Sequence, residues 1–189
     1  MKKATCLMAL LLCGWAAHAA LPDGWQLAGN KPQSYDCGVD QHTVYNGKPS
    51  GYLKSKSTAI DGFGTMMQYV SAEDYAGRRV RFSAYVMSEN AADWAGLWMR
   101  VDKDRQMVGF DNMQNRAVKG STFWKYYEVV LDVPEGSTGI GLGILLAGTG
   151  TVWLNSAKFE VVGTNIPTTS TVASQTSPAA GPTNLGFEK

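Results

Sequence analysis

The chain has 189 residues, of which 44% are hydrophobic and 21 are glycines. This length suits one globular domain of ordinary size, and the glycine content suits a β protein with many turns. The formal net charge is +1, and a nearly neutral chain lacks the electrostatic footprint of a protein that binds nucleic acid or an anionic membrane.

Residues 1–19 have the three parts of a secretory signal peptide. Lys2 and Lys3 form a basic start, residues 7–13 are apolar, and the small residues of a cleavage site follow in Ala17-His18-Ala19. The apolar run is too short to span a membrane. We therefore expect a periplasmic or secreted protein whose mature chain keeps 15 basic and 16 acidic residues.

Cysteine usage bears on anchoring and on disulfides. A lipoprotein acylated at Cys13 is the alternative to release, but Leu12 departs from the small residue that such sites prefer. Cleavage would remove Cys6 and Cys13 and leave Cys37, so we expect no intramolecular disulfide framework. Cys37 is expected to be a half-buried small residue, or else the link of a disulfide-bonded dimer.

The expected folded domain, residues 20–163, begins with a loop-rich stretch that glycine and proline punctuate up to residue 48. Residues 50–56 alternate as a solvated strand would, and residues 64–70 form a second alternating run. Residues 71–74 have the composition of a cap for one helical turn. No other segment has the helical period, so the pattern is that of strands.

A long strand at residues 78–87 leads to the hairpin around which the pattern is organised. Residues 97–102 alternate strictly, which is the signature of a strand. One face of this strand is apolar, which predicts that it packs in a core. The other face carries Trp98 and Arg100, an unusual pair of side chains for a solvent-exposed surface. The short polar connection at residues 103–106 fits a hairpin loop.

The remaining strands follow at regular intervals. Residues 123–133 form a long strand that Pro134 ends, and residues 151–163 supply the last strand pair of the core. Residues 139–144 place three glycines on one face and three aliphatic residues on the other. On the glycine face, either another layer packs closely or the surface is hollow.

The C-terminal region changes in composition. Residues 164–183 are rich in Thr, Ser, Pro and Ala, which predicts a flexible linker. Residues 184–189 look structured again, and we expect Phe187 to fill an exposed strand edge of its own molecule or of a strand-swapped neighbour. A frayed tail is the alternative.

Short strands separated by turns, with almost no helix, predict an all-β fold: an antiparallel β-sandwich, or jelly roll. Several runs resemble a family of bacterial jelly-roll domains that are related in architecture to galactose-binding-like and carbohydrate-binding modules. The resemblance covers about residues 24–163. The matching runs are 94–102 and 110–113, which are the most distinctive, together with 24–25, 38–40, 50–53, 77–82, 131–134 and 159–160.

The resemblance implies the same fold and, more weakly, a binding function, because a fold does not fix a function. Some members carry transcription-regulator labels, but the leader and neutral charge of this chain argue against a DNA role. Members often have proline after the arginine that follows the Phe-Asp-Asn-Met run. Here Ala117 follows Arg116, so this loop departs from the family pattern.

Aromatic and planar polar side chains on one sheet face predict a carbohydrate-binding surface. A sugar ring stacks its C–H face on an aromatic ring, while its hydroxyls pair with arginine, amide and carboxylate groups. The glycine face of residues 139–143 would leave room for the ligand. If neighbouring strands present matching faces, the predicted ligand-binding residues are Trp98, Arg100, Tyr85, Gln68, Trp124, Tyr126, Glu128, Asp111 and Asn112.

Each of these predictions has a structural alternative. The aromatic rings could instead pack in a second core, with Arg100 paired to Glu128, and Asn112 could simply hold a turn. Asp102 and Asp104 offer oxygen ligands without a complete calcium loop, and His42 reads as a surface residue. The sequence has no serine elbow, metal-binding helix or phosphate loop.

We therefore expect a non-enzymatic binding module, without cofactor or metal, for carbohydrate or another cell-envelope ligand. Scattered carboxylates leave glycoside cleavage open as a distant alternative. The main alternative is a structural or interaction protein whose sandwich surface meets a protein partner. We expect no nucleic acid partner and no membrane span, and the chain would be a monomer, a strand-swapped dimer or a Cys37-linked dimer.

Export has a direct test. Mass spectrometry of the protein from its native host is expected to show a chain that begins near Ala20, because the cleavage site precedes this residue. An intact Met1 or an acylated Cys13 would contradict the expectation.

Overall fold

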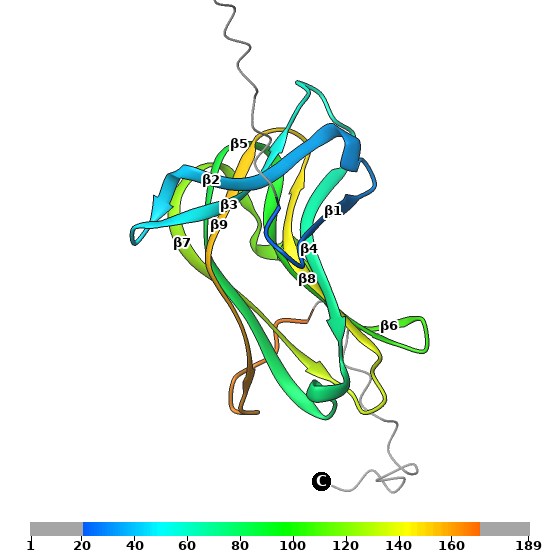
Figure 1. The fold of residues 1–189 in the computed structure, drawn as a ribbon. Helices are drawn as coiled ribbons and strands as arrows, with labels where there is room; N and C mark the ends of the chain where they lie inside the picture. Colours follow the sequence, from blue (N-terminus) through cyan, green and yellow to red (C-terminus); the bar gives the residue numbers. More distant parts are fainter. Residues whose placement is uncertain (1–20, 171–189) are drawn as a thin grey trace, which may run out of the picture.

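A computed structural model describes residues 21–170 and arranges them as one curled antiparallel sheet (Figure 1). Residues 1–20, which include the predicted signal peptide, and residues 171–189, which include the expected terminal strand at 184–189, lie outside the described residues. The strands are β1 (Gln26–Gly29), β2 (Tyr35–Tyr45), β3 (Lys48–Ser55), β4 (Phe63–Ser71), β5 (Arg78–Lys103), β6 (Gln106–Asp111), β7 (Val118–Val133), β8 (Gly139–Ala147) and β9 (Thr151–Val162).

Helix is almost absent, as the sequence predicts. Three single turns of 3-10 helix occur among residues 21–170: η1 (Pro32–Ser34), η2 (Glu73–Tyr75) and η3 (Gln114–Arg116). The predicted turn at residues 71–74 corresponds to η2. The expected all-β antiparallel fold is confirmed.

The two layers of the sandwich share strand β5, which is 26 residues long. Its first part, residues 78–89, pairs with β7 and β9, whereas residues 94–103 pair with β8 and β6. One layer, here called layer A, therefore has the order β2-β3-β9-β5-β7. Layer B has the order β1-β4-β8-β5-β6.

The bend that carries β5 from layer A to layer B lies between these two parts. The register of β5 against β7 shifts repeatedly between Val86 and Ala95, and such irregularities bend a strand. Asn90 adopts a φ of 52° within the bend, a left-handed conformation that asparagine tolerates better than most residues.

The core lies between the two layers, and β5 contributes a row of apolar side chains from each part. Burying each large side chain contributes about 1.5–3 kcal/mol to folding. The predicted apolar face of residues 97–102 is confirmed. The β5 side chains with at most 1% exposure in this core are Val80, Phe82, Ala84, Val86, Ala95, Leu97, Met99 and Val101.

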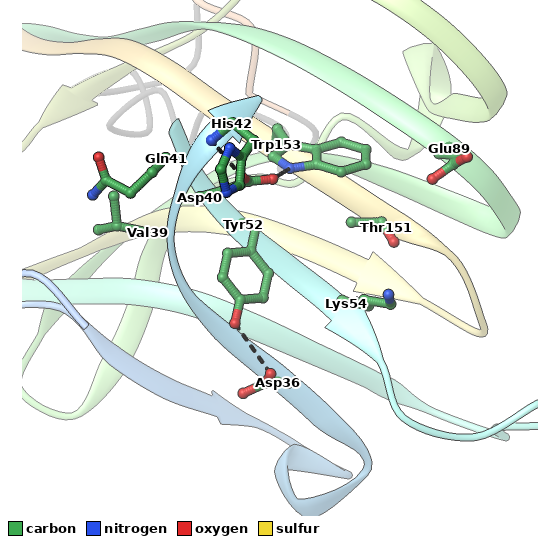
Figure 2. A pocket seen from close by; sticks show the side chains of 10 residues that line it. All are labelled: Asp36, Val39, Asp40, Gln41, His42, Tyr52, Lys54, Glu89, Thr151 and Trp153. Carbon is green, nitrogen blue, oxygen red and sulfur yellow. Dashed lines mark hydrogen bonds between the residues drawn. The ribbon is translucent and has the colours of Figure 1, made fainter. Parts of the chain in front are cut away.

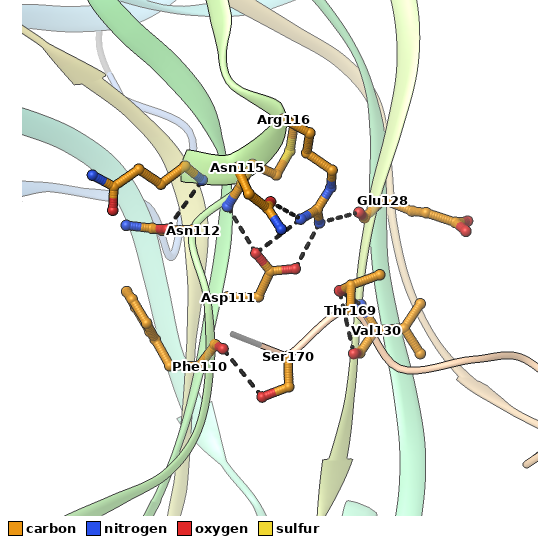
Figure 3. A network of polar contacts seen from close by, with 11 residues as sticks. Phe110, Asp111, Asn112, Asn115, Arg116, Glu128, Val130, Thr169 and Ser170 are labelled. Atoms are coloured by element: carbon orange, nitrogen blue, oxygen red, sulfur yellow. Dashed lines mark hydrogen bonds and ion pairs between the residues drawn. The ribbon is translucent and has the colours of Figure 1, made fainter. Parts of the chain in front are cut away.

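A buried ion pair fastens the loop after β6 to strand β7 (Figure 3). Asp111 is fully buried and accepts hydrogen bonds from the Arg116 guanidinium at 2.6 and 3.1 Å. It also accepts the backbone N–H of Met113 at 2.8 Å, and Arg116 reaches the Glu128 carbonyl at 3.0 Å. Asp111 is therefore a structural residue, which corrects its predicted ligand role.

Asn112, next to this ion pair, also has a local role. Its side-chain oxygen accepts the backbone N–H of Gln114 at 3.1 Å, which is the turn geometry that the sequence analysis gave as the alternative to ligand binding. The observed hydrogen bond explains Asn112 without a ligand.

The first residues of the expected linker, 164–170, pack on the edge of β7. The Thr169 backbone N–H donates to the Val130 carbonyl at 2.8 Å, and the Thr169 hydroxyl accepts the Val130 N–H at 2.8 Å. Arg79 donates to the carbonyls of Thr164 and Ile166. The domain therefore holds residues 164–170 by hydrogen bonds, beyond the strand that ends at Val162.

Breaking the buried ion pair is expected to destabilise the fold strongly. Asp111→Ala should cost about 3–5 kcal/mol of unfolding free energy, because it leaves the Arg116 charge without its partner. The melting temperature should fall by roughly 10 °C. The matched control is Asp132→Ala, since Asp132 pairs with Arg79 but its side chain is 56% exposed. That change should cost less than about 1 kcal/mol, and equal losses in the two variants would contradict this account.

Candidate functional site

The structure divides the expected ligand surface into two. Tyr85 lies opposite Tyr126 on the outer face of layer A, and Glu128 lies on the same face. Trp98 and Arg100 lie on the outer face of layer B. The bend in β5 separates the two groups, because it turns the outer face of the strand from one side of the sandwich to the other.

Gln68 belongs to neither surface. It lies opposite Leu142, which in turn lies opposite the buried Met99, so its side chain is on the inner face of layer B. There it lines a cleft of about 510 Å³ between the layers together with Phe82. The prediction that Gln68 shares a face with Trp98 is wrong. Side chains alternate along β4, and Gln68 is at a position whose side chain points to the inner face of the layer.

The expected vacancy over the glycines of β8 is absent. A Cβ atom on Gly141 would meet ring carbons of Trp98 at 3.2 Å and of Tyr69 at 3.5 Å. The two rings, which come from the strands on either side, therefore cover Gly141, while Tyr69 also covers Gly139 and Met67 covers Gly143, so no hollow remains. The alternative pairing of Arg100 with Glu128 is also absent, since Arg100 pairs with Asp102 at 2.9 Å and Glu128 with Arg81 at 3.4 Å.

A groove of about 870 Å³ crosses the outer face of layer A (Figure 2). This volume is within the usual range of ligand sites. Strands β2, β3, β5 and β9 supply its walls. The lining residues are Asp36, Val39, Asp40, Gln41, His42, Tyr52, Lys54, Glu89, Thr151 and Trp153.

Two aromatic rings lie side by side in this groove, because Tyr52 on β3 is the direct partner of Trp153 on β9. A carboxylate holds the polar edge of each ring (Figure 2). The Tyr52 hydroxyl donates to Asp36 at 3.1 Å, and the Trp153 indole N–H donates to Asp40 at 2.9 Å. Both rings are half-buried and fixed in orientation.

Asp40 is the centre of a local hydrogen-bond network. Its second oxygen accepts the backbone N–H groups of His42 and Thr43 at 2.8 and 3.1 Å, where β2 departs from regular pairing with β3. Burial alone would raise the pKa of Asp40, but the hydrogen bonds from Thr43, His42 and Trp153 lower it well below its usual value. Asp40 is therefore ionised at neutral pH.

Tyr52 is neutral under the same conditions. Burial is the largest cause that raises its pKa to about 12, and the hydrogen bond to Asp36 acts in the same direction. The hydroxyl thus keeps its proton for Asp36, and the ring stays anchored across the physiological pH range.

An aromatic cluster, defined as Tyr45, Tyr85, Trp124 and Tyr126, lies on the same outer face of layer A. Tyr45 stacks on Tyr85 with ring centroids 4.3 Å apart and lies 5.4 Å from Trp124. Tyr126 is 44% exposed and meets Tyr85 edge-on at 5.7 Å. The predicted residues Tyr85, Trp124 and Tyr126 are thus brought together here.

The β2–β3 hairpin reaches this cluster because Asn155 holds it. The buried Asn155 amide donates to the carbonyls of Lys48 and Pro49 at 3.0 Å and to the Ser50 hydroxyl at 2.9 Å. This places Tyr45, at the end of β2, over the β5 strand. The hairpin therefore forms one wall of the outer face of layer A.

Four residues of this site were not predicted from the sequence: Tyr52, Trp153, Asp36 and Asp40. Tyr52 and Trp153 stand in segments that were predicted as strands, but their pairing joins positions 101 residues apart. Local alternation carries no signal for such a pairing. His42, predicted to be a surface residue, is exposed and lines the groove.

Cys37 cannot link two molecules in this conformation. It is 7% exposed and belongs to the core. Burial is the main cause that raises the pKa of its thiol to about 11, with Asp36 adding to the effect. A Cys37-linked dimer would therefore require this part of the core to open.

Neither a metal cluster nor a membrane-spanning helix is found in the part of the chain that the structure describes. Residues 21–170 contain no group of three or more His, Cys, Asp or Glu side chains placed to hold a metal ion. In the same range no helix is long and apolar enough to cross a membrane. Asp102, offered as a calcium ligand, instead accepts hydrogen bonds from Tyr69 and Arg100.

Sequence comparison finds a relative that this chain covers in part. No family model matches the chain. The chain is 41% identical over 168 residues to YbfP of Bacillus subtilis (strain 168), described as an uncharacterized HTH-type transcriptional regulator. The match covers 88% of this chain and 57% of that regulator, so the chain spans little more than half the length of its relative.

Solved structures share the fold at low sequence identity. The CBM22-1–GH10 structure of Clostridium thermocellum xylanase 10B, complexed with xylohexaose, has a TM-score of 0.55 at 13% identity, and the match covers 77% of this chain and 27% of that chain. The CBM22-1 xylan-binding domain of Paenibacillus barcinonensis Xyn10C has a TM-score of 0.52 at 18% identity, with 77% and 90% covered. The chain thus has the fold of carbohydrate-binding modules.

The Asp40 network makes a prediction about stability and pH. Asp40→Asn is expected to cost about 1–2 kcal/mol at pH 7, since a carboxylate that accepts three hydrogen bonds becomes an amide. Because folding lowers the pKa of Asp40, its contribution is present above the pKa of the unfolded chain and is lost as pH falls towards the folded value.

The measurement is unfolding free energy from pH 7 to pH 3 for the natural protein and the Asp40→Asn variant. The difference between them should shrink as the pH falls through about 4. Asp61→Asn, at an exposed position, is the matched control and should show little difference at any pH. A difference for Asp40→Asn that stays constant down to pH 3 would contradict the assignment.

Proposed function

We propose that this chain is a non-catalytic carbohydrate-binding module and that a soluble glycan chain lies in the groove of layer A. The observation that carries the proposal is the pair of rings, Tyr52 and Trp153, fixed side by side by Asp36 and Asp40. Ring faces held in this way are platforms on which the C–H face of a sugar stacks.

The polar groups around the rings suit sugar hydroxyls. Gln41, His42 and Lys54 lie along the groove and offer donors and acceptors. The groove holds three carboxylates, those of Asp36, Asp40 and Glu89, against one lysine. This charge disfavours acidic polysaccharides and supports a neutral glycan.

The carboxylates support binding rather than catalysis. A general acid in glycoside cleavage needs a raised pKa, whereas the pKa of Asp40 is lowered. Asp36 and Asp40 are also engaged with the edges of the two rings. The geometry of these two carboxylates suits them to position the rings.

We further propose a periplasmic or secreted location, on the basis of the signal peptide predicted at residues 1–19.

The fold comparisons suggest which glycan to test first. Two of the solved structures that share this fold are described as complexed with xylohexaose or as a xylan-binding domain. These matches bear on the fold alone, and we take from them only the choice of xylohexaose as the first neutral probe.

A second candidate function follows from the relative in Bacillus subtilis. A segment 41% identical to this chain lies within a protein described as an HTH-type transcriptional regulator, and 43% of that protein lies outside the match. In such a protein this module would bind the ligand, and DNA contacts would come from the remainder. The nearly neutral charge of this chain agrees with that division. A protein partner on the sandwich surface is the remaining alternative.

Titration calorimetry with xylohexaose tests the groove. Trp153→Ala should weaken binding roughly five- to tenfold, because one aromatic platform is lost, whereas Trp153→Phe should keep most of the affinity. The matched control is Tyr69→Ala on layer B, which should bind like the natural protein. Should xylohexaose not bind, a glycan array identifies another neutral ligand for the same variants, and an array without any neutral binder would overturn the proposal.

A further inference from the structure

We propose that the outer face of layer B is a second carbohydrate-binding surface, and that it holds the flat face of a packed, insoluble polysaccharide. The surface is made by Trp98, Tyr69 and Arg100. It lies on the opposite side of the sandwich from the groove and does not depend on the groove for its function.

The two rings lie flat because strand β8 has no side chains beneath them. Trp98 is the direct neighbour of Gly143 on one side of β8, and Tyr69 is the direct neighbour of Gly141 on the other. The Trp98 ring approaches within 3.2 Å of the place where a Gly141 Cβ would be. The Trp98 ring therefore lies across the β8 backbone, with its N–H edge at Thr65 and its far carbons over Gly141.

The polar edges of both rings are already satisfied by buried groups. The Trp98 indole N–H donates to the hydroxyl of Thr65 at 2.7 Å, and that hydroxyl donates to the Ile144 carbonyl at 2.9 Å. The Tyr69 hydroxyl donates to Asp102 at 3.1 Å. Thr65 and Asp102 are 3% and 7% exposed, so the anchors are rigid, while Tyr69 itself is 52% exposed.

Arg100 adds hydrogen-bonding capacity without adding net charge. Its Nε and Nη2 groups donate to Asp102 at 3.1 and 2.9 Å, which neutralises the guanidinium. The side chain is 47% exposed, and a guanidinium has five N–H donors. Arg100 and Tyr69 share the same Asp102 oxygen as acceptor, so the remaining guanidinium donors lie near the Tyr69 hydroxyl, and a neutral glycan suits this uncharged surface.

The flat shape favours an ordered ligand over a single mobile chain. A groove encloses a glycan chain, whereas a flat pair of rings contacts only one face of each sugar. The binding free energy per sugar is therefore smaller on the flat surface. A free chain would also lose conformational freedom on binding. Chains packed in an insoluble polysaccharide have already lost this freedom, so modest stacking contacts suffice to retain the protein.

The experiment measures partition of the protein onto microcrystalline cellulose, chitin powder and insoluble xylan. The natural protein should be retained by at least one of them. Tyr69→Ala should lower the partition constant at least about fivefold, and Tyr69→Phe should not, because the ring rather than the hydroxyl makes the contact. Arg100→Ala should also reduce retention and provides an independent variant if Tyr69→Ala lowers the melting temperature.

Three controls separate this surface from the groove and from general adhesion. Adding Tyr69→Ala to Trp153→Ala should lower retention by the same factor as Tyr69→Ala does in the natural protein, and Tyr69→Ala should leave the calorimetric affinity for xylohexaose unchanged. Phe123→Ala removes an aromatic side chain that is 92% exposed and should have no effect. The proposal is overturned if none of the three polysaccharides retains the protein, if both the Tyr69→Ala and Arg100→Ala variants are retained normally, or if Phe123→Ala reduces retention equally.

Discussion

The rest of the structure depends on one strand that belongs to two layers. Strand β5 supplies a row of core side chains to each layer, and it can do so only because its pairing breaks between Val86 and Ala95. Side chains alternate along a strand, so the bend also decides which way the intervening residues face. Tyr85 and Trp98 consequently point away from each other, on the two outer surfaces of the sandwich.

On both outer surfaces, a hydrogen bond from the polar edge of each aromatic ring fixes the orientation of that ring. In each case the polar edge of the ring donates to an oxygen that the fold keeps in place, so the ring loses its rotational freedom during folding and not on binding. Ring orientation is therefore a property of the free protein. The pairs are Tyr52 with Asp36, Trp153 with Asp40, Trp98 with Thr65 and Tyr69 with Asp102.

The fold class could be predicted from the sequence because alternation with period two is a local property. Residues 97–102 show it, and their apolar face is buried as expected. The bend in β5 could not be predicted, since residues 78–87 and 97–102 each look like complete strands. The pairing of Tyr52 with Trp153 was equally hidden, because it joins distant segments through tertiary structure. Asp111 was misassigned for the same reason: its burial and its partner arise only in the folded chain.

The contact between Thr169 and Val130 affects where a fragment of this domain can be made to end. Thr169 covers part of the free edge of β7 by satisfying both backbone groups of Val130. A fragment that stops at residue 163 would expose this edge, and exposed strand edges pair readily with other chains. Fragments that end before or after Thr169 would thus share one fold and differ in their tendency to aggregate.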